Sequence, residues 1–582
     1  MKKILFILTA GVLALSSCDD LFTPAKENFK EVGQMDVEPD FAMGFLTKAY
    51  SALSNNYVNT EYATDDAVVN ENNNAFRTMA TGGWTSTLYT SINEWSSAYG
   101  GIQYINQFLA KINDVKWSED PERAAMLKVR MQGEAFAMRA ILHYQLLRAH
   151  AGYDSEGVLL GVPYLETYLG ANDEFNIPRL TFKETVDKII ADLDKAIDLL
   201  PLDYEDATAV PSKYTQYTKN LNVYNRTMGA SFRLLVSGRI AKAYRSRVTL
   251  LAASDGFANT GTWADAAKSA ADLLKENNGI EGISKGAVEY YAASIADNLS
   301  AGSNPAEIIW RDNVATNNNY ESDNLPPSLN GNGRMNPSQN LVDAFPMVNG
   351  YPISSEESGY DAAAPYANRD PRLTTYIIYN GSKNIGVDNK TISTVEKTTD
   401  GVNTNQQRST RTGYYMKKRL RMDVNITSGS ATTKAHYVPR IRYTEMYLNY
   451  AEAANEAYGP KADGGNGFTA FDVIKAIRER AGICKGAEDP YLEECAQSKE
   501  KMRELIRNER RLELCFENFR FWDLRRWKQK LTETVKGINW KADGTYEIFD
   551  VEKRDFSNYM NYPPIPNSEI LKYNNLKQNK GW

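Results

Sequence analysis

Two pairs of acidic residues have the proximity that acid and base catalysis could use. Asp65 is followed directly by Asp66, and Glu445 shares a predicted helix with Glu452. A glycosidase needs two carboxyl groups, one to protonate the leaving group and one to attack or to activate water. A chain with 73 acidic residues contains such pairs by chance, however. These pairs therefore give little support for catalysis.

Other side chains that commonly carry catalysis are few. The chain has three histidines, His143, His150 and His436. None has other potential ligand residues near it at the spacing that a metal site requires. The sequence contains no G-x-S-x-G elbow, no phosphate-cradling Gly-Lys-Ser/Thr loop and no setting for a reactive cysteine. We therefore expect a protein without catalytic residues, metal or cofactor, which is not an enzyme.

One loop-like segment suits ligand binding better. It lies between residues 57 and 90, has glycines at its flank, and carries Asn72, Asn73, Asn74, Arg77 and Trp84. Aromatic faces stack on sugar rings, and amide and guanidinium groups hydrogen-bond to sugar hydroxyls, so this mixture suits a glycan. Asparagine-rich loops are also simply good turns, which leaves a structural alternative open.

Tyr320 is a second candidate contact. It follows Asn317, Asn318 and Asn319, which repeats the combination of amides with an aromatic ring. We predict that Tyr320 also contributes to ligand binding.

Amphipathic helices make up most of the chain around these loops. A capping pattern at Thr181 and Glu184 begins a helix that Pro201 ends. Paired helical segments recur, with small residues at the predicted crossings, at 237–254 with 262–279 and at 442–459 with 467–482. Such pairs are typical of tetratricopeptide-like hairpins, which bury their apolar faces by stacking. The sequence predicts a mainly α fold with about four hairpins.

A long irregular insertion interrupts the helices at about 304–437. It is rich in Asn, Gly and Pro, and alternating segments within it predict a few short strands. Loops of this length in a compact domain are usually functional or lie at an interface.

The stretch from Arg503 to Trp527 is the densest in charge and aromatic rings. Met502, Leu505, Leu512, Phe516 and Phe519 are spaced to share one buried helical face, and Asn518 predicts a turn. Like charges recur four apart, with arginines at 503, 507 and 511 and glutamates at 509, 513 and 517. Like charges four residues apart repel one another within a helix, so we expect the opposite charges to come from other segments. The candidate partners are Glu445 and Glu452 for the arginines, and Arg478 or Arg480 for the glutamates.

Nucleic acid is an unlikely partner for this arginine-rich helix. The formal net charge of the chain is −6, and removal of the two lysines near its N-terminus makes it more negative. Phosphate binding depends on an excess of lysine and arginine. The stretch is therefore interpreted as scaffold with internal ion pairs, and no nucleic acid is expected to bind.

The N-terminus has the pattern of an exported lipoprotein. Residues 1–17 combine a basic start, an apolar run too short to span a membrane, and small residues, as in a signal peptide. Leu15 to Cys18 looks like a lipobox, so we expect Cys18 to be lipidated and to anchor the protein. Residues 18–40 would then form a tether, and residues 41–582 the body.

The remaining cysteines are odd in number. Cys484 and Cys495 could form a disulfide bond, whereas Cys515 is expected to be a small buried hydrophobic residue.

Several segments, taken in order along nearly the whole mature chain, resemble one known family. They are the lipobox with its acidic continuation, EAFAMRAILHYQLLRAHAG followed by GVPYL, RDPRL, GYYMKKRL, RYTEMYLNYAEAANEA, AIRERAG, NERRLELCFENFRFWDLRRW and YPPIPNSEI. This series resembles the SusD/RagB family of outer-membrane nutrient-binding lipoproteins of Bacteroidetes.

The resemblance carries expectations about function. It implies non-enzymatic capture of glycans at the cell surface and their delivery to a SusC-like TonB-dependent transporter. It also implies a lipid anchor in the outer membrane, with the body facing the exterior. Trp95, Tyr99 and Asn106 match a structural helix of the family and Trp310 a strand, so these four are not expected to bind ligand. Capture of peptides or other nutrients, or glycan hydrolysis on a helical scaffold, are the alternatives.

Overall fold

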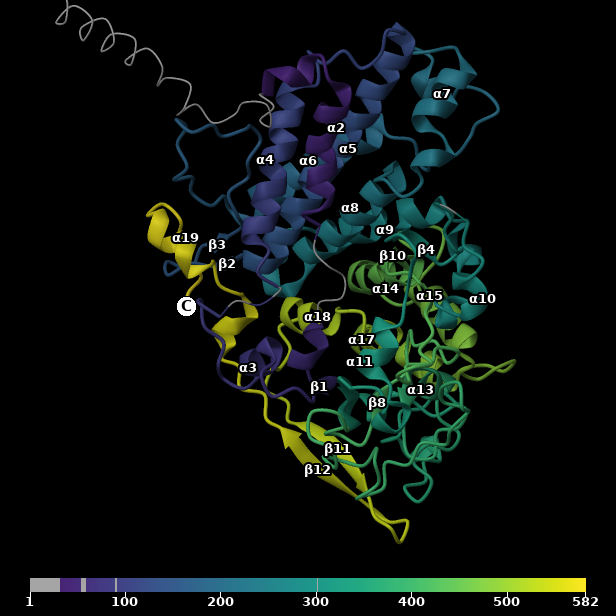
Figure 1. Ribbon diagram of the computed structural model, residues 1–582. Coiled ribbons are helices and arrows are strands. Elements are labelled where there is room, and N and C mark those ends of the chain that lie inside the picture. The colour runs from purple at the N-terminus through teal and green to yellow at the C-terminus, as the bar shows by residue number, and fades with distance from the viewer. Residues whose placement is uncertain (1–31, 54–58, 89, 91, 301) are drawn as a thin grey trace, which may run out of the picture.

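The computed structural model describes residues 32–53, 59–88, 90, 92–300 and 302–582. Helices dominate this part of the chain, and its strands are few and short. Figure 1 shows long helices in the upper half and a loop-rich half below, from which the hairpin of β11 (Val535–Trp540) and β12 (Tyr546–Glu552) projects. The mainly α fold class predicted from the sequence is therefore confirmed.

The predicted signal peptide, the lipidation of Cys18 and most of the predicted tether fall outside the described residues, so they stay predictions. Within the part of the chain that the structure describes, no helix is both long and apolar enough to cross a lipid bilayer.

The long helices pack side by side in one array. In order of contact they are α2 (Pro39–Tyr50), α4 (Trp95–Lys111), α5 (Pro121–His150), α6 (Phe182–Leu199), α8 (Gly238–Ala253), α9 (Trp263–Lys275), α14 (Tyr443–Tyr458) and α15 (Ala470–Ala481). Among the described helices they form four successive pairs, and α8–α9 and α14–α15 are the two hairpins predicted from the sequence. Each helix buries its apolar stripe against its neighbours, which is how stacked helical hairpins gain stability.

Local sequence signals account for where these helices begin and approach one another. The Thr181 hydroxyl accepts a hydrogen bond from the backbone N–H of Glu184 at 3.2 Å, and the Glu184 carboxylate accepts one from the N–H of Thr181 at 2.9 Å. This reciprocal cap starts α6 as predicted. In α4, a Cβ atom added to Gly101 would lie 2.7 Å from the Cβ of Ala52 and 2.8 Å from Leu142. Glycine at this position therefore allows α4 to pack closely on its neighbours.

The irregular half is held together by short strands from distant parts of the chain. β1 (Ala67–Val69) pairs with β6 (Met335–Pro337), and β4 (Ile308–Arg311) pairs with β10 (Pro439–Arg442), both antiparallel. In the same way β5 (Ala315–Asn317) pairs with β9 (Lys434–His436). The segment at 57–90, predicted to be loop-like, thus contains a strand that fixes it to the insertion at 304–437.

Helix α17 (Lys499–Glu513) joins the two halves. Met502 and Leu505 near its start pack in the core of the array, whereas Leu512 near its end packs in the core of the irregular half. The helix ends at Glu513, and Phe516 and Asn518 adopt left-handed backbone angles, with φ of +62° and +67°. The predicted turn at Asn518 is confirmed, but the prediction that one helical face continues to Phe519 was wrong because the helix ends earlier.

Two of the three glutamates at 509, 513 and 517 form ion pairs with the arginines predicted as their partners. Arg478 donates to Glu509 at 2.8 Å, and Arg480 donates to Glu513 at 2.8 Å. Glu517, the third member, accepts from Lys418 and from Arg442 instead. The opposite charges therefore come from other segments, which removes the repulsion between neighbouring glutamates.

The predicted partners of the arginines at 503, 507 and 511 were wrong. Arg503 pairs with Glu456 at 2.6 Å, and Arg511 pairs with Asp65 and Asp66. Glu452 accepts from Arg526, in α18 (Arg520–Arg526), at 2.5 Å. Glu445 instead binds Arg247 of α8 at 2.7 Å, because α8 packs against α14. The sequence could not show this contact between two separate hairpins.

Arg372 is the centre of a fully buried charge cluster. Its side chain is 0% exposed and lies 2.6 Å from Asp370, 2.9 Å from Glu509 and 2.9 Å from Glu513. It comes from α13 (Pro371–Tyr376), in the insertion, and so links this part of the chain to α17. No local sequence pattern predicted this cluster.

The pH dependence of stability should reflect this cluster. Burial alone would raise the pKa of Glu513, but Arg480, Arg372 and Arg442 outweigh it and lower the pKa from 4.5 to about 2. A lowered carboxylate pKa stabilises the folded state above the unfolded-state pKa, and this stabilisation is lost as pH falls toward 2. We expect the free energy of unfolding, measured by denaturant titration, to fall between about pH 4.5 and 2, and to fall less steeply in Glu513→Gln. An unchanged slope in the variant would contradict this assignment.

The three cysteines in the described part are free thiols. The disulfide bond considered for Cys484 and Cys495 is therefore not formed in this structure. Cys515 is 2% exposed and packs in the core of the irregular half, which confirms its prediction as a buried hydrophobic residue.

Candidate functional site

The predicted asparagine loop lies between β1 and α3 (Ala75–Ala80). Asn72 and Asn73 are exposed, whereas Asn74 caps α3 because its side-chain oxygen accepts from the N–H of Phe76 at 3.0 Å. Arg77 donates to the side chain of Asn72 at 2.9 Å. The loop therefore exposes the amides of Asn72, which is bonded to Arg77, and of Asn73, while Asn74 has a structural role.

Charged groups from other segments surround this loop. Arg334 lies 3.2 Å from Glu71, and Arg77 lies 3.2 Å from Glu552 at the end of β12. We term Glu71, Asn72, Asn73, Arg77 and Arg334 the loop surface. Arg334 pairs with Glu71 inside this surface, and Arg77 pairs with Glu552 outside it, so both arginines have a carboxylate partner.

Trp84 is placed differently from what the sequence suggested. Its side chain is 4% exposed, and its ring contacts the rings of Phe521, Phe556 and Trp582 with centroids 6.2, 6.0 and 4.9 Å away. The guanidinium of Arg525 lies 5.5 Å from the indole centroid. A sugar can reach the indole face only if these side chains separate, so the predicted contact at Trp84 requires a rearrangement.

Tyr320 lies in α11 (Asn319–Asn324), in the irregular half. Its ring lies 5.0 Å from the Arg419 guanidinium, and its hydroxyl contacts the sulfur of Met416 at 3.5 Å. Tyr320 packs against the core of the irregular half, which also contains Tyr62.

A second group of side chains, which the sequence analysis did not single out, forms a partly exposed aromatic surface. It consists of Tyr366, Tyr379, Trp540 and Tyr546. The rings of Tyr366 and Tyr379 stack with centroids 4.1 Å apart, and the Trp540 ring lies 6.1 Å from Tyr366 and 4.8 Å from Tyr546. We term these four residues the aromatic surface.

Hydrogen bonds hold the rings of the aromatic surface in place. The indole N–H of Trp540 donates to the Tyr366 hydroxyl at 3.3 Å, and the Tyr546 hydroxyl donates to the carbonyl of Ala362 at 2.7 Å. On the opposite face of the hairpin, Glu547 accepts from Asn539 at 3.2 Å and from Lys541 at 2.7 Å. The rings of the aromatic surface are therefore ordered before a ligand binds, which lowers the entropic cost of binding.

Part of this surface has a signal in the sequence. Trp540 and Tyr546 flank a turn in which Asp543 accepts from the N–H of Thr545 at 3.0 Å and Gly544 has a φ of +86°. Asp-Gly between alternating residues is a strong hairpin signal, and it places the two rings opposite each other. Tyr366 and Tyr379 come from the insertion, and no local pattern predicts that they meet this hairpin.

The β11–β12 hairpin connects the two surfaces. Glu552, at one end of β12, contacts Arg77 of the loop surface and Arg411 at 2.8 Å, whereas Tyr546 at the other end belongs to the aromatic surface. A strand of seven residues spans about 20 Å. The loop surface and the aromatic surface thus lie at opposite ends of one rigid hairpin.

The carboxylate pairs considered for catalysis are engaged in ion pairs. Asp65 lies 2.8 Å from Arg520 and 3.1 Å from Arg511, and Arg511 also binds Asp66. Burial would raise the pKa of Asp65, but Arg520 and Arg511 outweigh it and hold the pKa below its usual range. A general acid of a glycosidase needs a raised pKa, so Asp65 is poorly suited to that role.

The histidines are also placed in structural surroundings. His143 stacks on Tyr164 with ring centroids 3.7 Å apart and accepts from the N–H of Leu165 at 3.1 Å. Burial lowers its pKa to about 3. Among the described residues there is no group of three or more His, Cys, Asp or Glu that could hold a metal ion.

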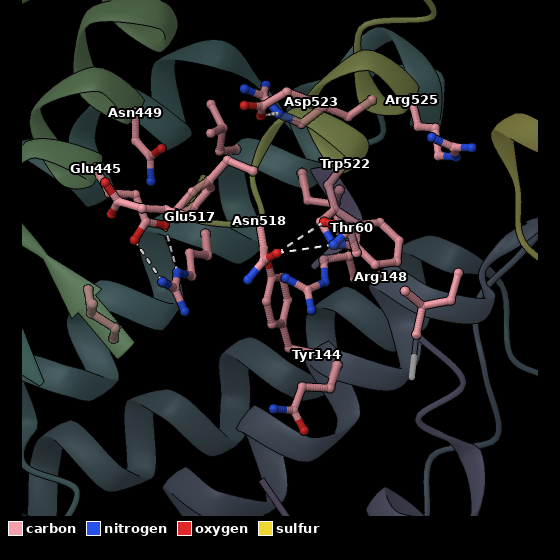
Figure 2. A pocket seen from close by; sticks show the side chains of 18 of the residues that line it. Thr60, Tyr144, Arg148, Glu445, Asn449, Glu517, Asn518, Trp522, Asp523 and Arg525 are labelled. Carbon is pink, nitrogen blue, oxygen red and sulfur yellow. Dashed lines mark hydrogen bonds and ion pairs between the residues drawn. The ribbon is translucent and has the colours of Figure 1, made fainter. Parts of the chain in front are cut away.

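A pocket lies between the helical array and α18, and Figure 2 shows side chains that line it, among them Tyr144, Arg148 and Trp522. Its volume is about 140 Å³. Small-molecule pockets usually enclose roughly 300–1,000 Å³, so this pocket is too small for an oligosaccharide. The two surfaces described above fit a large polar ligand better.

Comparison with known sequences places the chain among related proteins. A family profile described as "SusD family" matches residues 306–582, and one described as "Starch-binding associating with outer membrane" matches residues 37–224. A SusD-like protein of Formosa agariphila is 30% identical over 147 residues, which are 25% of this chain and 26% of the relative. The match therefore spans about a quarter of that relative.

Solved structures share the fold. A SusD-like protein of Bacteroides fragilis superposes with a TM-score of 0.72 at 24% identity, over 96% of this chain and 100% of the other. A SusD-like carbohydrate-binding protein, also of Bacteroides fragilis, gives a TM-score of 0.68 at 22% identity, over 94% and 100% of the two chains. The whole described body thus has the architecture of these proteins.

Proposed function

We propose, from the premise that this chain belongs to the SusD/RagB family, that it binds glycans on the surface of its irregular half and does not cleave them. Carbohydrate binding is the activity named for one protein of the same fold. Paired and buried carboxylates, such as Asp65, give no support to hydrolysis.

The aromatic surface is the observation that carries this proposal. Sugar rings stack on aromatic faces, while their hydroxyl groups need polar partners beside the ring. Tyr366, Tyr379, Trp540 and Tyr546 supply such faces, and the hydroxyls of Tyr379 and Thr374, 3.1 Å apart, lie beside them. Because hydrogen bonds already fix two of these rings, little side-chain freedom is lost when a ligand binds.

The loop surface is the second contact region in this proposal. Asn72, Asn73 and Arg77 offer amide and guanidinium groups for sugar hydroxyls, and Tyr320 is a further predicted contact. A ligand that follows the β11–β12 hairpin for about 20 Å reaches both surfaces. Asn74 and Trp84, which were also predicted as contacts, take part only if the cap of α3 and the packing around Trp84 change.

Delivery to a SusC-like TonB-dependent transporter at the outer membrane completes the proposal. It is supported by the family resemblance and by the family description that mentions association with the outer membrane. The proposed anchor is a lipid on Cys18, with the body facing the cell exterior. Reconstitution with the transporter, or its co-purification, is the direct measurement of this partnership.

Calorimetry tests the binding step. We expect the chain beginning at Asp19 to bind at least one oligosaccharide from a panel of plant, host and microbial glycans. We also expect no new reducing ends after prolonged incubation with that glycan. Heat of binding with peptides but with none of the glycans would reject the glycan assignment in favour of peptide capture, and release of reducing ends would favour hydrolysis.

A further inference from the structure

Three arginines meet one carboxylate where β12 ends beside the loop surface. The Glu552 side chain lies 3.2 Å from Arg77 of α3 and 2.8 Å from Arg411 of the insertion, and it also pairs with Arg554. In Figure 1, α3 and β1 lie just above the β11–β12 hairpin, at the end opposite its tip. We term these four residues the arginine cluster. One carboxylate balances one guanidinium, so two positive charges have no counter-charge within the cluster.

The charged side chains in the segments next to the cluster do not remove this excess. They are equal in number, with Arg334, Arg408, Lys536 and Lys553 on one side and Glu71, Asp323, Asp550 and Asp555 on the other. Arg334 lies 3.2 Å from Glu71, and Lys536 is opposite Asp550 in the hairpin. The cluster therefore keeps a local positive charge, in a chain whose formal net charge is −6.

Arg77 and Arg411 also have unused hydrogen-bond donors. Their side chains are 26% and 14% exposed, so both reach solvent. Arg77 donates through Nη1 to the carbonyl of Glu71 and to Asn72, and Arg411 donates through Nη1 to the carbonyl of Val69 and to the shared carboxylate. Among the residues that the structure describes, the Nη2 atoms of both arginines have no hydrogen-bonding partner, and neither atom is buried. Each guanidinium thus has a terminal N–H group available to a ligand.

The two guanidinium groups are neighbours, because both contact the same oxygen, Oε2 of Glu552. Burial lowers the pKa of Arg77, and the like charge of Arg411 adds to this lowering. A second anion beside them would relieve this repulsion, and planar guanidinium groups are suited to bind oxyanions through two parallel hydrogen bonds. The exposed amides of Asn72 and Asn73 lie on the same loop as Arg77 and can bind hydroxyl groups.

We propose that the arginine cluster binds an acidic sugar of the glycan, through a carboxylate or sulfate group held by Arg77 and Arg411. This inference rests on the glycan binding proposed above and narrows it to acidic glycans. The aromatic surface, at the other end of the β11–β12 hairpin, stacks on sugar rings whatever their charge. The arginine cluster therefore determines which glycans bind.

Matched pairs of oligosaccharides test the need for negative charge. One pair is oligogalacturonate and its methyl ester, and the other is a sulfated galactan oligosaccharide and its desulfated form. Calorimetry measures the Kd of each for the chain beginning at Asp19. In at least one pair we expect the acidic member to bind about tenfold more tightly than the neutral one, and the pair concerned distinguishes a carboxylate from a sulfate ligand. The difference should shrink as sodium chloride is raised from about 0.05 to 0.5 M, because salt screens exposed charges.

Substitutions in the cluster show whether the arginines cause this preference. Arg77→Gln and Arg411→Gln should each weaken binding of the acidic member by about tenfold and leave that of the neutral member unchanged. Trp540→Ala should instead weaken both members alike. Arg245 provides the matched control, because it pairs with Asp194 at 2.5 Å on the helical array. Arg245→Gln removes the same charge away from the cluster and should leave both affinities unchanged.

The outcomes separate this inference from the glycan binding on which it rests, and the Tm of each variant shows that it is folded. Equal affinity for both members of each pair, or equal effects of Arg77→Gln and Arg245→Gln, would overturn the inference and leave glycan binding intact. Binding of a neutral glycan from the panel together with neither acidic probe would do the same. Absence of binding to every glycan would instead refute the proposed function, and the inference with it.

Discussion

Replacement of Arg372 by methionine is expected to lower the free energy of unfolding by about 3–5 kcal/mol, because it removes one partner of a buried ion cluster. Asp370, Glu509 and Glu513 all contact Arg372, and every side chain in this group is fully buried. Without the guanidinium, three carboxylates remain near one another out of reach of water. Denaturant unfolding followed by circular dichroism measures the loss directly.

A matched control is available on the surface of the array. Lys183 pairs with Asp187 at 2.7 Å, but both side chains are more than half exposed. Exposed pairs contribute about 0–1 kcal/mol, so Lys183→Met should change stability little. Equal effects of the two substitutions would show that the Arg372 cluster is not the link between α13 and α17 that its geometry indicates.

Replacement of Trp540 by alanine is expected to weaken glycan binding by about 10- to 30-fold, as for an aromatic residue at the centre of a binding surface. Trp540 contacts both Tyr366 and Tyr546. Its removal therefore takes away one aromatic face for the sugar and also the ring contacts that hold Tyr366 and Tyr546 in place. Calorimetry with the glycan identified in the panel gives the change in Kd. The Tm of the variant, measured in parallel, shows that the body remains folded.

Two further variants test whether the loss of glycan affinity is specific to the aromatic surface. Trp263 is a half-buried tryptophan at the start of α9, on the helical array, and Trp263→Ala should leave the affinity unchanged. Trp84→Ala should lower Tm, because Trp84 packs against three other rings, and should leave the affinity of the folded protein nearly unchanged. Loss of affinity in Trp84→Ala but not in Trp540→Ala would show that the ligand binds at the loop predicted from the sequence and not at the aromatic surface.

The contrast between Trp84 and Trp540 shows where sequence-based reasoning about the site succeeded and failed. Both tryptophans lie next to glycines and polar residues, so their local sequences look equally suited to a ligand. Burial decides between them, and burial depends on which distant segments pack on each ring. Phe521, Phe556 and Trp582 cover Trp84, and all three come from the last part of the chain.

The sequence by itself determined the helices and the need for long-range ion pairs. Helical periodicity, the cap at Thr181 and the proline at 201 are local features, so α6 and the paired helices could be predicted. Like charges four residues apart along α17 repel one another, so opposite charges from other segments could also be predicted. Arg478 and Arg480 are two of these partners.

Only the tertiary structure decided which distant segments meet. The pairing of Arg511 with Asp65 and Asp66, the cluster around Arg372, the aromatic surface and the arginine cluster at Glu552 all join parts of the chain that are far apart in sequence. Spacing along one helix fixes which side chains share a face, but it carries no information about what packs against that face. The fold class followed from local patterns, whereas the candidate sites depend on contacts that exist only once the chain has folded.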